Sequence, residues 1–361
     1  MFRSVFRPFT VVIGIVLLVG LVATSCAPAV TPTPTPKPMP TSTPVVKEVV
    51  KVATPVPITK HFRVAWIPPD MFNPFWTYNR QGMEKIAAEA LAQKGYKIDI
   101  TQLAPIKTFD VGEQVAIFEN AIQMKVDGII CCVIDQNSVM PATRKAKAAG
   151  IPVVALSTDI PIPETLTYSG VKNVESARIT AEWVINNVLG GKGKFVLLSG
   201  IPGNLVSEER MKGYRQAIEA CGSSCELLAE EPAYFNREKG MAAMETLLVR
   251  FPHIDAAFCV NDEAALGAYE AVAAAGREDE VHVVGYDGNK DAIKSIMDGK
   301  ITASLDQDPW RQGADALKAL IDYWEGKQVP RDLSWVGEVI TPENAPEKYK
   351  RFAEMEIWYK P

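Results

Sequence analysis

Short runs of β-branched and other apolar residues alternate with amphipathic stretches from residue 63 onward. Eight of these runs are predicted to be strands: residues 63–67, 96–101, 128–134, 152–156, 194–198, 256–260, 281–285 and 301–305. The first stretch between them has apolar side chains at i, i+3, i+4, i+7 and i+8, which are Met83, Ile86, Ala87, Ala90 and Leu91. This spacing predicts a helix with one buried face.

Continuous apolar strands joined by helices are typical of parallel sheets covered on both faces. The predicted helices end near glycines, which are Gly95, Gly150, Gly276 and Gly299. About ten strands in 361 residues are too many for one three-layer domain, so two lobes of about 120 to 150 residues fit better. The predicted fold is α/β, with two doubly wound parallel-sheet lobes and a ligand cleft between them.

The first residues have a different pattern. Arg3 and Arg7 precede an apolar run from Phe9 to about Ala23, which is the layout of a secretory signal peptide and is short for a membrane span. Ala23-Thr24-Ser25-Cys26 resembles a bacterial lipobox, which implies a signal peptide over residues 1–25 and a lipid on Cys26. Cleavage without lipidation is the alternative, and it would release a soluble protein.

Residues 27–60 are dominated by Thr-Pro repeats. Proline fixes φ and removes a backbone donor, so this stretch favours extended polyproline II and builds no core. Fully extended, it would reach about 100 Å. We therefore expect residues 26–60 to be a lipid-anchor cysteine followed by a tether. The protein is expected to be extracytoplasmic, either attached by its lipid to the outer face of the cytoplasmic membrane or periplasmic.

The charge and the histidine content of the chain argue against a nucleic-acid-binding protein and against a zinc protein. The first 60 residues carry six basic side chains and one acidic one, whereas the whole chain has a net charge of −5, so the remainder is about −10. An acidic body repels phosphate backbones, and nucleic-acid binding is not expected. Three scattered histidines without a Cys-x-x-Cys pair argue against a zinc site. We expect neither a metal nor a cofactor.

Polar and aromatic residues follow the predicted strands, where an open parallel sheet binds its ligands. They are Asn73-Pro74-Phe75-Trp76, Asp135-Gln136-Asn137, Ser157-Thr158-Asp159, Tyr234-Phe235-Asn236-Arg237, Asn261-Asp262-Glu263, Tyr286-Asp287 and Asp306-Gln307-Asp308. Amides and acids bind hydroxyl groups, and flat rings cover the C–H faces of a sugar. The set predicts a polyhydroxylated small molecule, although each Asn, Asp or Ser alone is also an ordinary helix cap, and each aromatic ring an ordinary packing residue.

From His61 to about Ile340 the chain resembles the ribose-binding-protein-like, type I solute-binding components of ABC importers. Motifs of that family occur in its order: Asn73-Pro74-Phe75-Trp76, Gly150-Ile151-Pro152-Val153-Val154, Glu209-Arg210-Met211-Lys212-Gly213-Tyr214, Phe235-Asn236, Asn261-Asp262-Glu263-Ala264-Ala265-Leu266-Gly267-Ala268, Val284-Gly285-Tyr286-Asp287-Gly288 and Asp306-Gln307.

The resemblance implies a set of sugar contacts: Asn73, Phe75, Trp76, Arg210, Phe235, Asn261, Asp287 and Gln307. Phe75 and Trp76 would lie on one face of the ring and Phe235 on the other. Tyr286 replaces a common Phe and is a further candidate. Ribose binders place an Asp-Arg pair where this chain has Ser157-Thr158-Asp159, and they place an Asn in the segment that ends at Asp135. We keep Asp135 and Asp159 as candidate ligands, and another pentose, a hexose, a polyol or a furanosyl signal is as probable a ligand as ribose.

The resemblance also implies three hinge crossings, near residues 171–173, 307–309 and 334–337. The lobes would be residues 61–172 with 308–335 and residues 173–307 with 336–361. Ligand would close the lobes, and the closed form of a monomeric protein would dock on a permease with its ATPase. A sensor feeding chemotaxis or a membrane kinase is the alternative function.

Two other classes share parts of this pattern. A repressor-type regulator would need a helix-turn-helix at the N-terminus, and a glycosidase would pair Asp287 with Glu263 or Asp262. No nucleophile–base set accompanies them, so we expect no enzyme.

Cys221 and Cys225 form a candidate disulfide pair in an exported protein, whereas Cys131, Cys132 and Cys259 are predicted to be buried thiols.

Overall fold

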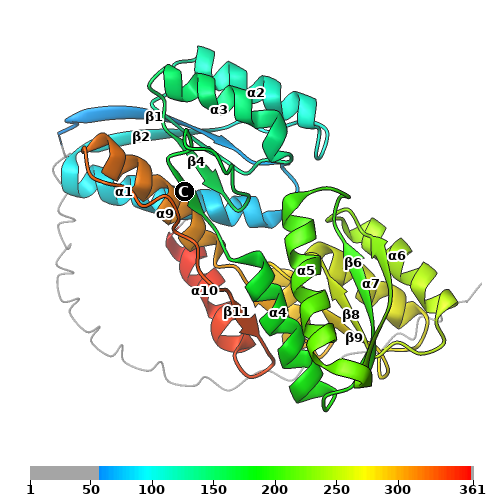
Figure 1. Cartoon of the computed structure of the whole chain (residues 1–361). Helices are drawn as coiled ribbons and strands as arrows, with labels where there is room; N and C mark the ends of the chain where they lie inside the picture. The colour runs from blue at the N-terminus through cyan, green and yellow to red at the C-terminus, as the bar shows by residue number, and fades with distance from the viewer. Residues whose placement is uncertain (1–56, 359–361) are drawn as a thin grey trace, which may run out of the picture. The chain divides into compact units, whose positions relative to one another are not determined.

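The alternation of strands and helices builds two parallel sheets, each covered by helices on both faces, in the part of the chain that the structure describes (Figure 1). This computed structural model describes residues 57–358. The predicted signal peptide, Cys26 and most of the tether lie outside the described residues. Within residues 57–358, no helix is both long enough and apolar enough to cross a bilayer.

The first lobe contains a five-stranded parallel sheet of order β2-β1-β3-β4-β5. Its strands are β1 (Lys60–Ile67), β2 (Tyr96–Gln102), β3 (Gly128–Cys131), β4 (Val153–Leu156) and β5 (Thr167–Ser169). One face packs on α2 (Val111–Gln123) and α3 (Gln136–Ala148), and the other on α1 (Pro74–Lys94) and α9 (Pro309–Trp324). The two helices of the second pair touch closely, because a Cβ on Gly313 would lie 1.9 Å from the backbone oxygen of Asn79.

The second lobe repeats this plan with a sheet of order β7-β6-β8-β9. Its strands are β6 (Gly193–Ser199), β7 (Cys225–Pro232), β8 (Ala256–Cys259) and β9 (His282–Val284). Its helices are α4 (Asn173–Trp183), extended by a π-helical turn (Val184–Val188), α5 (Leu205–Ala220), a short turn of 3-10 helix (Gly222–Ser224), α6 (Arg237–Arg250), α7 (Asp262–Ala274) and α8 (Lys290–Met297). The C-terminal helix α10 (Ala345–Trp358) packs on α8.

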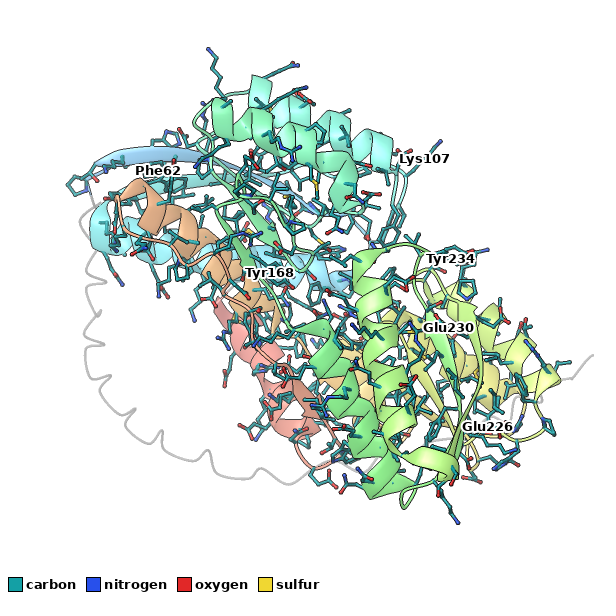
Figure 2. All side chains as sticks on the ribbon, viewed as in Figure 1. Phe62, Lys107, Tyr168, Glu226, Glu230 and Tyr234 are labelled. Atoms are coloured by element: carbon teal, nitrogen blue, oxygen red, sulfur yellow. A yellow bond between two sulfur atoms is a disulfide. The ribbon has the colours of Figure 1, made fainter. Side chains whose placement is uncertain are left out.

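Three passages of chain, residues 170–172, 307–308 and 334–337, connect elements of the first sheet's lobe to elements of the second. The hinge and the lobe boundaries that the resemblance implies stay predictions. The first and third passages run side by side, because Lys172 N–H donates to the Trp335 oxygen (2.8 Å) and Trp335 N–H to the Gly170 oxygen (3.2 Å). The second passage follows β10 (Ser304–Asp306), which pairs antiparallel with β11 (Glu338–Ile340). The three passages therefore form one narrow strip; Tyr168, labelled in Figure 2, lies at its edge.

The predicted fold class is confirmed, and several predicted strand limits are wrong. The strand predicted over residues 301–305 corresponds to β10, which begins only at Ser304. Ala303, before it, forms an isolated bridge. The strand predicted over 128–134 ends at Cys131, and residues 132–134 enter the cleft instead. β5, β7 and β11 are strands that the sequence analysis did not place.

Candidate functional site

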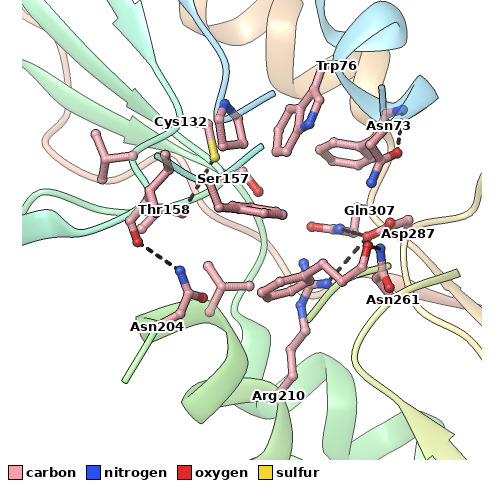
Figure 3. A pocket seen from close by; sticks show the side chains of 17 residues that line it. Asn73, Trp76, Cys132, Ser157, Thr158, Asn204, Arg210, Asn261, Asp287 and Gln307 are labelled. Atoms are coloured by element: carbon pink, nitrogen blue, oxygen red, sulfur yellow. Dashed lines mark hydrogen bonds and ion pairs between the residues drawn. The ribbon is translucent and has the colours of Figure 1, made fainter. Parts of the chain in front are cut away.

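A cavity opens between the two lobes at the carboxyl ends of the strands (Figure 3). It encloses about 480 Å³ of space free of protein atoms, part of it open to solvent. The lining residues are Pro69, Asn73, Phe75, Trp76, Phe109, Cys132, Val133, Ile134, Ser157, Thr158, Asn204, Val206, Arg210, Phe235, Asn261, Asp287 and Gln307. In each sheet the strand order reverses beside the first strand of the lobe, and the loops that follow β1, β3, β6 and β8 meet here.

Aromatic rings from both lobes form the walls. Phe75 and Trp76 begin α1, and their rings lie edge to face at 5.0 Å. Phe235 follows β7 in the other lobe, and its ring centroid lies 5.7 Å from that of Phe109. The backbone of Gly200 allows this position, because a Cβ there would lie 2.4 Å from the Phe235 ring. Such walls suit the C–H faces of a small ring.

Arg210 is held in the cavity by four groups. Its side chain is 4% exposed, and it stacks on the Tyr286 ring with the guanidinium carbon 3.8 Å from the ring centroid. Nη1 donates to the Val260 backbone oxygen (2.8 Å) and lies 3.4 Å from Asp287 Oδ1, and Nε donates to Asn173 Oδ1 (3.2 Å). The guanidinium is thus fixed before any ligand arrives, which lowers the entropy cost of binding.

Asp287 is the buried carboxylate opposite this cation. Burial raises its pKa to about 6, while Arg210 and a hydrogen bond from Gln307 Nε2 (2.7 Å) oppose that rise. Behind it, Asp262 is fully buried and accepts from the Ser304 hydroxyl (2.6 Å) and the Asn289 backbone N–H (2.7 Å). Burial, and then the charge of Asp287, raise the pKa of Asp262 well above its usual range. Of these two acids only Asp287 lines the cavity, where its carboxylate oxygens can accept hydrogen bonds from ligand hydroxyls.

Two amides in the lining are both helix caps and cavity residues. Asn73 Oδ1 accepts from the Phe75 N–H at the start of α1 (2.9 Å), and Asn261 Oδ1 accepts from the Ala264 N–H at the start of α7 (3.0 Å). From the sequence, helix capping and ligand contact were alternative roles for each of these residues. In the structure both amides cap a helix and also line the cavity.

Eight of the eleven predicted ligand residues line the cavity together: Asn73, Phe75, Trp76, Arg210, Phe235, Asn261, Asp287 and Gln307. The other three lie elsewhere. Asp135 caps α3 by accepting from the backbone N–H groups of Asn137 and Ser138. Asp159 pairs with Arg331 (2.9 Å) outside the cavity, and Tyr286 is buried beneath Arg210 with its hydroxyl donating to Asn173 Oδ1 (3.2 Å).

The sequence analysis missed several lining residues. Asn204 caps α5 and donates from Nδ2 to the Ile134 oxygen (2.9 Å), which links the lobes. An Asn three residues before Ser207 was a visible capping signal, since the Ser207 N–H bonds its side chain. Phe109 gave no such signal, because it lies in an irregular loop. Cys132 was assigned to a buried strand, yet its side chain reaches the cavity wall.

Backbone strain gathers at this site. Seven non-glycine residues in the described part of the chain have positive φ, and four of them line the cavity: Phe109, Ser157, Phe235 and Asp287. Such conformations cost about 1–3 kcal/mol each and persist only where the surroundings enforce them. The loops at the cavity are therefore held in place by the rest of the fold. No group of three or more His, Cys, Asp or Glu side chains among residues 57–358 is placed to hold a metal ion.

Comparison with known proteins identifies the family. The family model described as "Periplasmic binding protein domain" matches residues 64–328. The chain belongs to this family. Members of the family are extracytoplasmic binding proteins, and the chain is 32% identical over 275 residues to the ribose import binding protein RbsB of Bacillus subtilis, which covers 76% of this chain and 86% of that protein.

Two further similar proteins have another sugar, D-allose, in their descriptions. The D-allose-binding periplasmic protein of Escherichia coli is 32% identical to this periplasmic binding protein over 271 residues, which is 72% of this chain and 84% of the relative. An ABC transporter periplasmic solute binding protein from Actinobacillus succinogenes, solved with bound D-allose, matches with a TM-score of 0.74 and 28% identity over 79% of this chain and 99% of that one. The Escherichia coli relative is thus similar to this chain in sequence, and the solved structure is similar in sequence and fold.

Among the described residues of this periplasmic binding protein, two cysteines form a disulfide and three are free thiols. The structure joins Cys221, at the end of α5, to Cys225, at the start of β7, by a disulfide with a Cα–Cα distance of 5.7 Å. The three cysteines within strands or directly after them are free and buried, as predicted. Burial raises the pKa of Cys132 to about 12, which keeps its thiol neutral.

Proposed function

We propose that this chain is the extracytoplasmic sugar-binding component of an ABC importer, and that a monosaccharide or related polyol occupies the cavity between its lobes. The observation that carries this proposal is the pairing of aromatic walls from both lobes, Trp76 and Phe235, with the buried charges Arg210 and Asp287. A ligand that touches both walls contacts both lobes at once. It therefore stabilises the closed arrangement over an open one, in which half of these contacts are absent.

The remaining polar side chains support hydroxyl binding. Gln307 and Asn261 each present an amide beside the Arg210–Asp287 pair, so donors and acceptors alternate along one side of the cavity. Hydroxyl groups are both donors and acceptors, and a site of this kind binds them in pairs. The relatives named for ribose and allose are consistent with this class of ligand. The import function of those relatives also favours transport over the sensor function.

Calorimetric titration of the purified full chain in detergent tests the proposal. D-ribose, D-allose and myo-inositol serve as first probes. For any probe that binds the wild type, the Asp287→Ala variant should show no heat of binding. Asp291→Ala is the matched control, because Asp291 is an exposed acid in the first turn of α8, outside the cavity. Unchanged affinity in Asp287→Ala, or no binding by any sugar or polyol in a wider panel, would contradict the proposal.

The attachment and delivery steps form the second part of the proposal. Cys26 carries a lipid, residues 27–60 tether the lobes to the membrane, and the closed form delivers its ligand to a permease driven by an ATPase. The chain does this as a monomer. Incorporation of labelled palmitate into the wild type and not into Cys26→Ser tests the anchor. Uptake of the bound sugar by cells with and without this chain tests delivery, and unchanged uptake would favour the sensor function.

A further inference from the structure

The charged groups of the cavity and three of its amides are gathered at one end. The charged residues in the lining are Arg210 and Asp287, and the amides Asn73, Asn261 and Gln307 surround them. We call these five residues the polar end. In Figure 3, Asp287, Asn261 and Gln307 lie together on one side of the cavity, and Cys132, Ser157 and Thr158 lie on the other.

The opposite end is apolar. It is formed by Cys132, Val133 and Ile134, which follow β3, and by Val206 near the start of α5, and we call these four the apolar end. Each is at most 7% exposed. Cys132 behaves here as a small apolar side chain, because a neutral buried thiol is a weak hydrogen-bonding group.

The polar groups around the apolar end already have partners within the protein. Gln114 Nε2 donates to the Cys132 oxygen (2.9 Å) and its Oε1 accepts from the Ile134 N–H (2.9 Å), while the Ile134 oxygen accepts from Asn204 (2.9 Å). The Thr158 hydroxyl lies 3.6 Å from the Cys132 sulfur. Ser157 adds one hydroxyl on this side, and no charged side chain lines this end.

A ligand hydroxyl placed at the apolar end would lose its water without gaining an equivalent set of partners, whereas a methyl group would gain by burial. We propose that the ligand is a deoxy sugar, whose hydroxyls face the polar end and whose terminal methyl group lies against Cys132, Ile134 and Val206. This inference rests on the proposed function, since it names the class of sugar that the same cavity takes. It accounts for why both charged residues of the lining lie at one end.

Matched sugar pairs test the inference in the full chain. Each pair differs only by a terminal methyl group in place of a hydroxymethyl group: D-fucose with D-galactose, L-fucose with L-galactose, L-rhamnose with L-mannose, and D-quinovose with D-glucose. For the pair whose ring hydroxyls fit the polar end, the deoxy member should bind about 10 to 100 times more tightly by calorimetry. An apolar pocket discriminates against an added hydroxyl by factors of this size.

Two near-isosteric variants locate the methyl group. Cys132→Ser and Val206→Thr each add a hydroxyl at the apolar end, and each should lower the preference for the deoxy member at least threefold. Cys131→Ser is the matched control, because Cys131 is the buried neighbour of Cys132, does not line the cavity, and has the Val154 oxygen 3.7 Å from its sulfur as a partner for the new hydroxyl. Its preference should equal that of the wild type.

The outcomes separate this inference from the proposed function. Tighter binding of the hydroxylated member in every pair that binds overturns the deoxy-sugar inference and leaves sugar binding intact. A deoxy preference that neither folded variant changes also overturns it, because the methyl group would then lie elsewhere. If no sugar or polyol of any kind binds the wild type, the proposed function fails and the inference fails with it.

Discussion

Replacing Arg210 by Met tests whether Asp287 depends on this cation. The side chain of methionine has a similar length and no charge, so the substitution removes the ion pair and the bonds to Val260 and Asn173 while filling most of the space. Removing one member of a buried ion pair costs about 3–5 kcal/mol, because the other charge stays buried without its partner. We expect that loss in the free energy of unfolding at pH 7.

The loss should depend on pH in a defined direction. In the folded wild type the pKa of Asp287 is about 6, above its value of about 3.9 in an unfolded chain. A carboxyl group whose pKa is raised by folding binds more protons in the folded state, so its contribution to stability falls as pH rises from about 4 to about 6 and is constant above that. Without Arg210 the pKa rises further, and the fall continues to at least pH 7.

The continued titration of Asp287 in the variant sets the size of the pH dependence. One pH unit of continued titration corresponds to about 1.4 kcal/mol, so Arg210→Met should destabilise the fold by about that much more at pH 7 than at pH 6. At pH 5, where Asp287 is protonated in both proteins, only the unsatisfied Val260 and Asn173 oxygens and some packing are lost, at about 2 kcal/mol. Urea unfolding followed by tryptophan fluorescence at pH 5, 6 and 7 measures all three differences.

The double variant Arg210→Met with Asp287→Asn identifies the group responsible. The extra loss between pH 6 and pH 7 should vanish in it, because the titrating carboxyl is gone. An equal loss at pH 5 and pH 7 in the single variant would refute the reasoning. So would an increment that persists in the double variant, which would assign the effect to Glu209, whose pKa is raised by burial against the opposing charge of Arg210.

Four further substitutions, one of them a control, have expected outcomes. Gly200→Ala should weaken ligand binding tenfold or more by calorimetry with little change in stability, because the new Cβ displaces the Phe235 ring; unchanged affinity would contradict this wall of the site. Gly313→Ala should lower the melting temperature by forcing α1 and α9 apart, whereas Gly112→Ala, whose Cβ meets only an ordinary contact at 3.5 Å, should leave it unchanged or raise it. Cys221→Ser opens the disulfide and should cost about 2 kcal/mol in denaturant unfolding without altering ligand affinity, and an affinity change would link this loop to the site.

The extent to which the sequence predicts this fold follows from how each strand is buried. Strands β3, β4 and β8 are wholly buried, β1 and β6 each contain a run of four buried residues, and these apolar runs were recognised. β7 is an edge strand with a partly exposed, acidic sequence, and Glu226 and Glu230 are labelled on it in Figure 2. β5 and β11 have three residues each, too few for any periodicity to appear.

The site divides in a similar way. Residues directly after a buried strand, such as Asn73, Asn261 and Asp287, were predictable because parallel topology brings those ends together. Asp135 also follows a buried strand and caps the next helix, but unlike the capping amides Asn73 and Asn261 it does not line the cavity. Phe109 was not predictable, because its contact with Phe235 depends on two loops from different lobes, each held at positive φ by tertiary packing.

The ladder between residues 168–172 and 331–335 limits how the lobes are able to move. Four backbone hydrogen bonds join these two passages, from Tyr168 to Arg331, from Leu333 to Tyr168, from Trp335 to Gly170 and from Lys172 to Trp335. Pulling the passages apart would break bonds worth about 1 kcal/mol each, whereas twisting a two-stranded ribbon breaks none. We therefore expect any opening of the lobes to twist this ribbon and to leave its four bonds intact, so that substitutions elsewhere change the extent of the turn and not its direction.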